Sequence, residues 1–477
     1  MASAPETCPM SEVDVLFAAL RQAADPQAVE CIEQVVMHGS DRDLNRINVF
    51  AFADTHHLDE EKTIAAFLHA ARIGTFEMTW NVLCPGCGGV LETGANLKAV
   101  DRGTYHCALC AAGYEPTLDE MVEVTFTVSP RVRCIAAHEP DRLPPLEYYR
   151  QIFFSSGVDL PENLEASFAR ILLEMIELDP GEKAFVSLQL PAQFVIIFDA
   201  VTHSAQFIDV KGEPTDERQN LSMFISRDYA PNETLTLRPG LLRLTIENHT
   251  DRRVLPNVCI AGEQLHDLLG RRRPFLTAKR LLTNQSFRDI YRTDTLDIDQ
   301  RLRITSLTFL FTDLRGSTAL YERVGDLAAF DLVRAHFKVL HEIIATESGA
   351  VVKTIGDAVM ATFSSPDRAV ASALRMREAM LRLNAEHGRE DLLLKIGIHE
   401  GPCLAVNLND RQDYFGQTVN IASRVQGLAD PYVILTTEAV VENAQVSEIL
   451  RNNGIASVFR MEELQGVEKE VKIFALS

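Results

Sequence analysis

The sequence has no apolar run that could cross a membrane, and it is short of basic residues. A membrane helix needs about 18 or more consecutive apolar residues, and the apolar stretch Phe194–Phe198 is far too short. The chain has 46 Lys and Arg against 67 Asp and Glu, which gives a net charge of −21. Nonspecific nucleic-acid binding requires a basic surface, so this charge argues against a nucleic-acid partner. The Gly-rich phosphate-binding loop (Walker A) of many kinases and ATPases is also missing, which argues against enzymes of that type.

A secretory signal is a further pattern that the chain lacks. Its first residues, Met-Ala-Ser-Ala-Pro-Glu-Thr, do not have the basic and then apolar character of a signal peptide. We therefore expect a cytoplasmic protein with no direct membrane span. The length of 477 residues suggests about three domains, and the hydrophobic fraction of 46% is enough for several cores.

Changes of pattern along the chain divide it into five segments and predict a multidomain α+β protein. Residues 1–80 are expected to form a helical, winged-helix-like domain, and residues 81–118 a zinc-ribbon-like insert. In residues 119–265, apolar and polar residues alternate as they do in β-strands, which predicts a central β-sandwich. Residues 266–300 are expected to contain a linker helix, and residues 301–477 form the last domain.

The first segment shows apolar residues at helical spacing over 13–34, 41–56 and 59–73. Three helices followed by an extended stretch over 74–80 resemble a winged-helix arrangement, for which DNA binding is one interpretation. The second and third helices are acidic, with few basic residues to meet phosphates. This charge favours a structural or interaction role.

Two CxxC pairs follow, Cys84 with Cys87 and Cys107 with Cys110, and 19 residues separate them. This spacing is typical of a structural zinc site with four thiolate ligands, which stabilises a small unit with little core of its own. A single CxxC could be a redox pair, and disulfides are not expected in a reducing compartment. We therefore predict structural Zn²⁺ at these four cysteines.

The predicted sandwich contains no set of side chains that would form a catalytic site. Ligand sensing, partner docking and scaffolding all remain open for it. A regulatory ligand or protein acting on this N-terminal region is an expectation that the sequence does not specify further.

Two carboxylates stand at predicted strand ends in the last segment. Asp313 follows the apolar strand pattern of residues 305–311 and precedes Gly316, Ser317 and Thr318, which suit a loop that approaches phosphate. Asp357 lies in a hairpin turn between two further strand patterns. Carboxylates on neighbouring strands could hold two Mg²⁺ or Mn²⁺ ions about 3.5–4 Å apart, as in-line phosphoryl chemistry requires. The alternative interpretation is that Asp313 caps a helix and that Asp357 is an ordinary turn residue.

Lys353 and Asp413 form a donor and acceptor pair suited to adenine. Adenine presents an acceptor at N1 and a donor at its 6-amino group, whereas guanine reverses this pattern. Unmatched buried polar groups cost about 1–3 kcal/mol each, which is enough to select one base over the other. Without the neighbouring motifs, the two would be taken as a surface Lys and a loop Asp.

Asn420 and Arg424 are four residues apart in a predicted helix that follows Gly416, so both lie on one helical face. The planar Arg fork binds phosphate oxygens, and the Asn amide can orient a hydroxyl. A solvated face is the alternative. It fits less well because Val419, Ile421 and their neighbours make the helix largely apolar.

Together these residues resemble the catalytic domain of the class III nucleotidyl cyclases, the adenylate and guanylate cyclases. The resemblance covers about residues 307–476, with three motifs in family order and spacing. It implies a ferredoxin-like α/β fold, and two metal ions on Asp313 and Asp357 with the carbonyl of Leu314 assisting. It implies that Lys353 and Asp413 select adenine. It further implies that Asn420 and Arg424 stabilise the transition state, and that the site forms between two copies of the chain.

The implied activity is that of an adenylate cyclase, a lyase that converts ATP to 3′,5′-cyclic AMP and pyrophosphate in a homodimer. The alternatives are a guanylate cyclase, which Lys353 and Asp413 disfavour, and a non-catalytic nucleotide-binding signalling module. Diguanylate cyclases share a related fold, but their Gly-Gly-Asp/Glu-Glu-Phe signature is absent.

One departure from the family concerns the triphosphate. Where the family commonly has a Lys before a Gly, this chain has Gln465 before Gly466. Lys469 and Lys472 are the alternatives for that charge, and the sequence does not choose between them.

Overall fold

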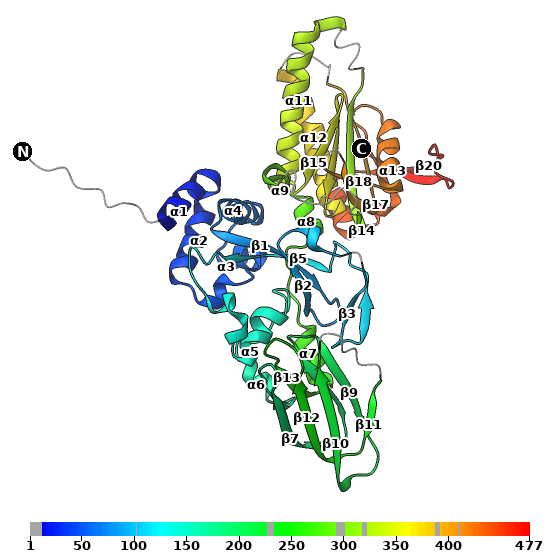
Figure 1. Cartoon of the computed structure of the whole chain (residues 1–477). Coiled ribbons are helices and arrows are strands. Elements are labelled where there is room, and N and C mark those ends of the chain that lie inside the picture. The colour runs from blue at the N-terminus through cyan, green and yellow to red at the C-terminus, as the bar shows by residue number, and fades with distance from the viewer. Residues whose placement is uncertain are drawn as a thin grey trace, which may run out of the picture. The chain divides into compact units, whose positions relative to one another are not determined.

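The computed structural model describes residues 12–101, 103–226, 233–291, 301–316, 322–386, 392–408 and 411–477. The chain divides into two compact units (Figure 1). The N-terminal unit comprises Met1–Pro116 and Glu120–Leu276, and the C-terminal unit comprises Thr117–Asp119 and Thr277–Ser477. Both units combine helices and sheets, so the protein is of mixed α and β structure.

The first part of the N-terminal unit is helical, but its helices are shorter than the sequence pattern suggests. The single helix expected over 13–34 is two helices, because Asp25 accepts hydrogen bonds from the amides of Gln27 and Ala28 and Pro26 starts a new helix. The helix expected over 41–56 is also divided. The elements are α1 (Glu12–Ala23), α2 (Pro26–His38), η1 (Asp41–Leu44), α3 (Val49–Thr55) and α4 (Glu60–Ile73).

A three-stranded sheet packs against these helices. Its order is β2 (Val90–Gly94), β1 (Phe76–Leu83) and β5 (Val122–Val128), and Phe126 of β5 meets Phe67 of α4 with ring centroids 5.2 Å apart. The strand over 122–128 therefore belongs to this sheet, whereas the predicted segment boundary at residue 119 assigned it to the sandwich. Alternation shows that a strand has a buried face, but it does not show which strand will be its partner. A small hairpin of β3 (Tyr105–Cys107) and β4 (Ala112–Tyr114) carries two of the cysteines.

Two further sheets of the N-terminal unit share one apolar core. Leu188 and Leu244 from one sheet and Val195, Ile208 and Val258 from the other belong to this core, which is the arrangement of a sandwich. One sheet has the order β10-β12-β7 and the other β11-β9-β8-β13-β6. The strands are β6 (Leu172–Met175), β7 (Lys183–Leu190), β8 (Phe194–Asp199), β9 (Ser204–Val210), β10 (Thr215–Ile225), β11 (Leu235–Leu237), β12 (Gly240–Asn248) and β13 (Pro256–Ile260). Short helices α5 (Pro145–Tyr148), α6 (Leu164–Phe168) and α7 (Glu263–Gly270) accompany them.

The linker helix expected over 266–300 is not one helix. The chain forms α8 (Ala278–Leu282) and α9 (Gln285–Ile290), and the side chain of Asn284 accepts from the amide of Phe287 to start the second. Both short helices belong to the C-terminal unit. Residues 292–300 of the expected linker lie outside the described part of the chain.

An eight-stranded sheet forms the centre of the C-terminal unit. Its order is β15-β16-β14-β17-β19-β21-β20, and β18 pairs with β17 beside this path. The strands are β14 (Arg301–Leu314), β15 (Ala350–Ile355), β16 (Ala358–Phe363), β17 (Leu394–Leu408), β18 (Arg411–Phe415), β19 (Ile434–Thr437), β20 (Ser457–Glu462) and β21 (Val471–Leu476). The helices are α11 (Asp326–Thr346), α12 (Pro366–Glu386), α13 (Gln417–Gly427), α14 (Glu438–Val441) and α15 (Ala444–Asn452).

Helices cover both faces of this sheet. Figure 1 shows α11 and α12 on one side and α13 on the other. On β19, Ile434 packs into the core with α11 and α12, whereas Leu435 packs into the core with α13, as strand alternation requires. The approach of α13 to β17 depends on Gly397, because a Cβ at that position would lie 2.2 Å from the backbone nitrogen of Gln426. This close packing fixes the helix that carries Asn420 and Arg424.

Candidate functional site

The end of β14 and the β15–β16 hairpin place two carboxylates together. The apolar stretch before Asp313 is buried in the sheet, and Asp313 is the penultimate residue of β14. Thr312 pairs with Val359 at the start of β16, so the hairpin turn that holds Asp357 reaches the same end of the sheet. Gly356 makes this turn with a φ of 65°, in the left-handed region that favours glycine.

The electrostatics of this pair fit a bound cation. Burial and then the charge of Asp357 raise the pKa of Asp313, whereas the charge of Lys395 lowers it. Oδ2 of Asp357 is buried and has no hydrogen-bond partner within the described residues. Lys395, opposite Asp313 on β17, donates through Nζ to the carbonyl of Gly427 at 2.8 Å. The two carboxylates therefore hold excess negative charge in a half-buried site, which suits a divalent ion with oxygen ligands.

Leu314 and the loop after it contribute through their backbone. The side chain of Leu314 is buried in the core, so any part in a metal site falls to its carbonyl oxygen. Gly316 has a φ of 75°, which turns the chain away from β14. Ser317 and Thr318, which the sequence suggested for phosphate approach, lie outside the described residues.

Lys353 and Asp413 are brought together as a pair. Nζ of Lys353 on β15 lies 2.5 Å from Oδ2 of Asp413 on β18. The Lys353 side chain is 43% exposed and that of Asp413 only 12% exposed, so the lysine end of the pair faces an incoming ligand. Oδ1 of Asp413 accepts from the amide of Tyr414 at 2.8 Å, which orients the carboxylate. The pair joins residues 60 positions apart in the chain.

Arg288 on α9 holds the two strands that carry this pair, and sequence reasoning missed it. Its Nη2 donates to the carbonyl of Val352 at 3.3 Å and to the carbonyl of Gln412 at 2.9 Å, the residues just before Lys353 and Asp413. One guanidinium group therefore fixes the spacing of β15 and β18. A lone Arg in an apparent linker gave no signal of this role, because its partners are backbone carbonyls with no sequence signature.

Asn420 and Arg424 lie on α13, as their spacing predicted. Asn420 is exposed, and Arg424 is half-buried with its guanidinium beside the turn at Gly466, where a Cβ would lie 3.6 Å from Nη2. One chain brings together Asp313 with Asp357 and Lys353 with Asp413. Among the described residues, no hydrogen bond or ion pair connects these pairs to Asn420 or Arg424 on α13.

The lysines near the C-terminus differ in how they are engaged. Nζ of Lys472 lies 2.7 Å from Oε1 of Glu438 and 4.7 Å from the ring centroid of Phe459. Lys469 is exposed, as is Gln465 in the turn before β21. Lys472 is thus held by its own neighbours, and it is the less suitable of the two lysines to meet a triphosphate.

The four cysteines of the two CxxC pairs form one cluster in the N-terminal unit. Their Sγ atoms all lie within 4.8 Å of one another, and the pairs Cys84–Cys110 and Cys87–Cys107 are each 3.6 Å apart. Thiolates at about 2.3 Å from a tetrahedral zinc would be about 3.8 Å apart, so the cluster fits this ion. The cluster could therefore hold a metal, and its ligand set favours zinc.

Both parts of the chain match known families. Residues 300–476 match the adenylate and guanylate cyclase catalytic domain, and residues 10–289 match a family of unknown function, DUF5939. An adenylate cyclase of Anabaena cylindrica is 33% identical over 157 residues, which cover 30% of this chain and 31% of that protein. An adenylate cyclase of Mycosarcoma maydis is 31% identical over 170 residues, which cover 31% of this chain and 7% of that protein.

Among solved structures, the adenylyl cyclase CyaB of P. aeruginosa is 24% identical and matches with a TM-score of 0.34. The match covers 37% of this chain and 96% of that chain. The present chain spans less than a third of the length of the two curated adenylate cyclases.

Among the described helices, none is long and apolar enough to serve as a membrane span. The chain thus carries an adenylate and guanylate cyclase catalytic domain over residues 300–476, and over residues 10–289 it belongs to the family of unknown function DUF5939.

Proposed function

We propose that this protein is an adenylate cyclase, a lyase that converts ATP to 3′,5′-cyclic AMP and pyrophosphate. The observation that carries the proposal is the contact between Lys353 and Asp413, which places a donor and an acceptor side by side. Lys353 would donate to N1 of adenine, and Asp413 would accept from the 6-amino group. Guanine would place its own donor against Lys353 and its acceptor against Asp413, at a cost of about 1–3 kcal/mol for each unmatched group.

The carboxylate pair would hold the metals of the reaction. Asp313 and Asp357, with the carbonyl of Leu314, would bind two Mg²⁺ or Mn²⁺ ions. The buried Oδ2 of Asp357, which no described residue hydrogen-bonds, is available for them. When bound, such ions lower the pKa of the ribose 3′-hydroxyl and neutralise the triphosphate. The excess negative charge of Asp313 and Asp357 is the feature that supports this assignment.

The helix residues would act on the reacting phosphate. The 3′-oxygen forms a bond to the α-phosphorus, the bond to the bridging oxygen of pyrophosphate breaks, and the hydroxyl proton passes to water. Arg424 would stabilise the charge that develops on the α-phosphate, and Asn420 would orient the ribose. No side chain needs to act as a nucleophile, so catalysis rests on positioning and charge.

We propose that a homodimer completes each site. Ile355 lies two residues after Lys353 on β15, and Phe415 two residues after Asp413 on β18, so each shares the face of the pair. Ile355 is 54% exposed and Phe415 is 67% exposed, and such apolar groups around polar ones are typical of an interface. A second copy covering this face would supply Asp313 and Asp357, while the first supplies the other four side chains.

The substrate assignment is tested by incubating the purified chain with Mn²⁺ or Mg²⁺ and either ATP or GTP. We expect cyclic AMP as the main product. Lys353→Met should lower kcat/KM for ATP by about 10- to 100-fold, because it removes one base contact and leaves Asp413 unpaired. Lys338→Met, which alters an exposed lysine of α11, is the matched control. Faster turnover of GTP would favour a guanylate cyclase, and no product from either nucleotide would favour a non-catalytic module.

The interface is tested with Phe415→Glu. A charge in the centre of an apolar contact is costly to bury, so we expect the variant to sediment as a monomer and to lose at least about 90% of its activity. The control is Phe185→Glu, which changes a phenylalanine of the N-terminal unit that is 59% exposed. A monomeric Phe415→Glu protein with normal activity would contradict the shared site.

A further inference from the structure

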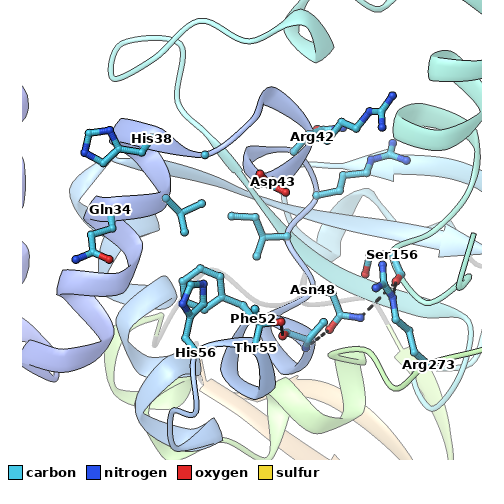
Figure 2. A pocket seen from close by; sticks show the side chains of 16 residues that line it. Gln34, His38, Arg42, Asp43, Asn48, Phe52, Thr55, His56, Ser156 and Arg273 are labelled. Carbon is cyan, nitrogen blue, oxygen red and sulfur yellow. Dashed lines mark hydrogen bonds between the residues drawn. The ribbon is translucent and has the colours of Figure 1, made fainter. Parts of the chain in front are cut away.

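The N-terminal unit contains a cavity that the nucleotide chemistry does not use. Its volume is about 630 Å³, which lies in the range of small-molecule sites. It opens between α2, η1 and α3, and the segments at Ser156 and Arg273 close its other side (Figure 2). All of its lining residues belong to the N-terminal unit.

The lining carries more positive than negative charge. Three arginines line it, Arg42, Arg46 and Arg273, against one carboxylate, Asp43. Arg42 is neutralised, because its Nε lies 2.9 Å from Oε2 of Glu147. Asp43 is occupied as well, since its Oδ2 accepts from both the amide and the hydroxyl of Ser40 at 2.8 Å. Arg46 and Arg273 remain as the cations that a ligand would meet.

Within the described residues, these two arginines donate hydrogen bonds to neutral oxygens. Arg46 donates to the carbonyl of Ile152 and, at 3.2 Å, to Oγ1 of Thr93, and Arg273 donates through Nε to the carbonyl of Ser156 at 2.7 Å. Glu123 is the carboxylate whose charge acts on Arg46, but it is buried and accepts from Ser156 and Asn81. The charge of Arg46 is thus partly balanced by Glu123, whereas Arg273 has no carboxylate partner within the described residues. In a chain with a net charge of −21, such a guanidinium group at a cavity is an exception that favours an anion.

The lining also includes apolar and aromatic side chains. Val35, Ile47 and Phe52 are among them, and the ring of His56 lies against that of Phe52 with centroids 4.4 Å apart. Figure 2 shows Phe52 and His56 on a different side of the cavity from Arg273. A ligand that fills this space would therefore combine an anionic group with an apolar body.

The cationic side is held in place by the fold. Asn48 is 7% exposed, and it caps α3 through Oδ1 while its Nδ2 donates to the carbonyl of Pro274 at 2.8 Å, next to Arg273. Arg46 has a φ of 45°, in the left-handed region, and its amide donates to Oγ1 of Thr127 at 3.0 Å. A non-glycine residue held in this backbone conformation is strained, and such strain concentrates at functional sites.

We propose that this cavity binds a small molecule that carries a phosphate or a carboxylate on an apolar body. Arg46 and Arg273 would bind the anion, and the side chains of Val35, Ile47 and Phe52 would take up the apolar part. Arg273 lies four positions before Thr277, the first residue of the long segment of the C-terminal unit, so an occupant would act on the chain segment that leads into the cyclase domain. Binding does not depend on the cyclase activity, whereas regulation through this segment rests on the proposed function.

The experiment uses the full chain and three probes of similar shape: phenyl phosphate, benzoate and the neutral benzamide. Binding is measured by ligand-observed NMR titration at millimolar concentrations. We expect at least one anionic probe to bind about tenfold more tightly than benzamide, and the order of the two anions identifies phosphate or carboxylate as the preferred group. Arg273→Gln should weaken the anion about tenfold without changing benzamide. Arg271→Gln, an exposed neighbour outside the lining, is the matched control and should behave as the native chain.

Two results would overturn the proposal: neither anion binds better than benzamide, or Arg273→Gln binds the anions as well as Arg271→Gln does. Arg273→Lys keeps the charge but loses the fork, so it should fall between the native chain and Arg273→Gln. Thermal unfolding of each variant without probe establishes that it is folded. Cyclic nucleotide formation with and without the probes is a separate readout, so a failure of the proposed cyclase activity leaves the binding result intact.

Discussion

Asp313→Asn is expected to lower the rate of cyclic nucleotide formation by about 10³-fold or more while the protein remains folded. The substitution keeps the shape of the side chain and removes one of the two charges that would hold the metals. Product formation is measured with Mn²⁺ and Mg²⁺, and the control is Asp331→Asn at an exposed carboxylate of α11. Near-native activity of Asp313→Asn would contradict its assignment as a metal ligand.

The stability of the same variant separates a loss of catalysis from a loss of folding. Burial and Asp357 raise the pKa of Asp313, so at neutral pH without metal the charged form opposes folding. Asparagine removes this penalty, and the metal-free variant should unfold at the same temperature as the native chain or slightly higher. An inactive variant with a markedly lower unfolding temperature would point to a structural role for Asp313.

Mixing two inactive variants tests whether the site is shared between copies. Asp313→Asn disables the metal half of a site, and Arg424→Ala disables the phosphate half. In equal mixtures about half of the dimers hold both variants and each of those has one intact site, so about a quarter of the native activity should return. Each variant mixed with itself is the control. No recovery, in a mixture shown to exchange subunits, would place the complete site within one chain.

The places of the candidate site residues in the fold could be predicted from the sequence, because each of them lies in or next to an element with a clear apolar pattern. Asp313 follows a buried strand, Asp357 lies in a tight hairpin, and Arg424 lies on a helix that starts after a glycine. The sequence predicts that Lys353 and Asp413 select adenine, and in the structure their side chains are in contact. The roles assigned to these residues stay predictions that the proposed substitutions test.

Other features depend on tertiary pairing, which the local pattern does not encode. The strand over 122–128 alternates clearly, yet its partner is β1 and not the sandwich. The exposed end of β10 is the polar run Asp216 to Asn220, which has no alternating pattern that would predict a strand. Arg288 acts on two backbone carbonyls, and the anion-binding cavity combines segments more than 200 residues apart. None of these features has a spacing that a single sequence could reveal.

The second large effect that we expect is the loss of stability when the cysteine cluster is prevented from binding the zinc ion that we predict there. Cys84, Cys87 and Cys107 are part of a buried core that includes Tyr149 and Phe153, so the cluster is not a detachable surface feature. Metal binding to such sites supplies about 10 kcal/mol or more of folding free energy in small zinc domains. Without a metal ion, the four closely spaced thiols would be buried with no ion to coordinate, and this contribution to folding would be lost.

Cys87→Ala should therefore abolish zinc binding and lower the unfolding temperature of the N-terminal unit by at least about 10 °C. Zinc content is measured by elemental mass spectrometry, with one ion per chain expected in the native protein, and unfolding is followed by circular dichroism. The control is Cys259→Ala, which removes a buried thiol of the same core that lies outside the four-cysteine cluster. Because the proposed nucleotide site lies in the C-terminal unit, basal cyclase activity should persist below the new transition. Zinc-free protein with unchanged unfolding would show that the four thiols pack as ordinary core residues.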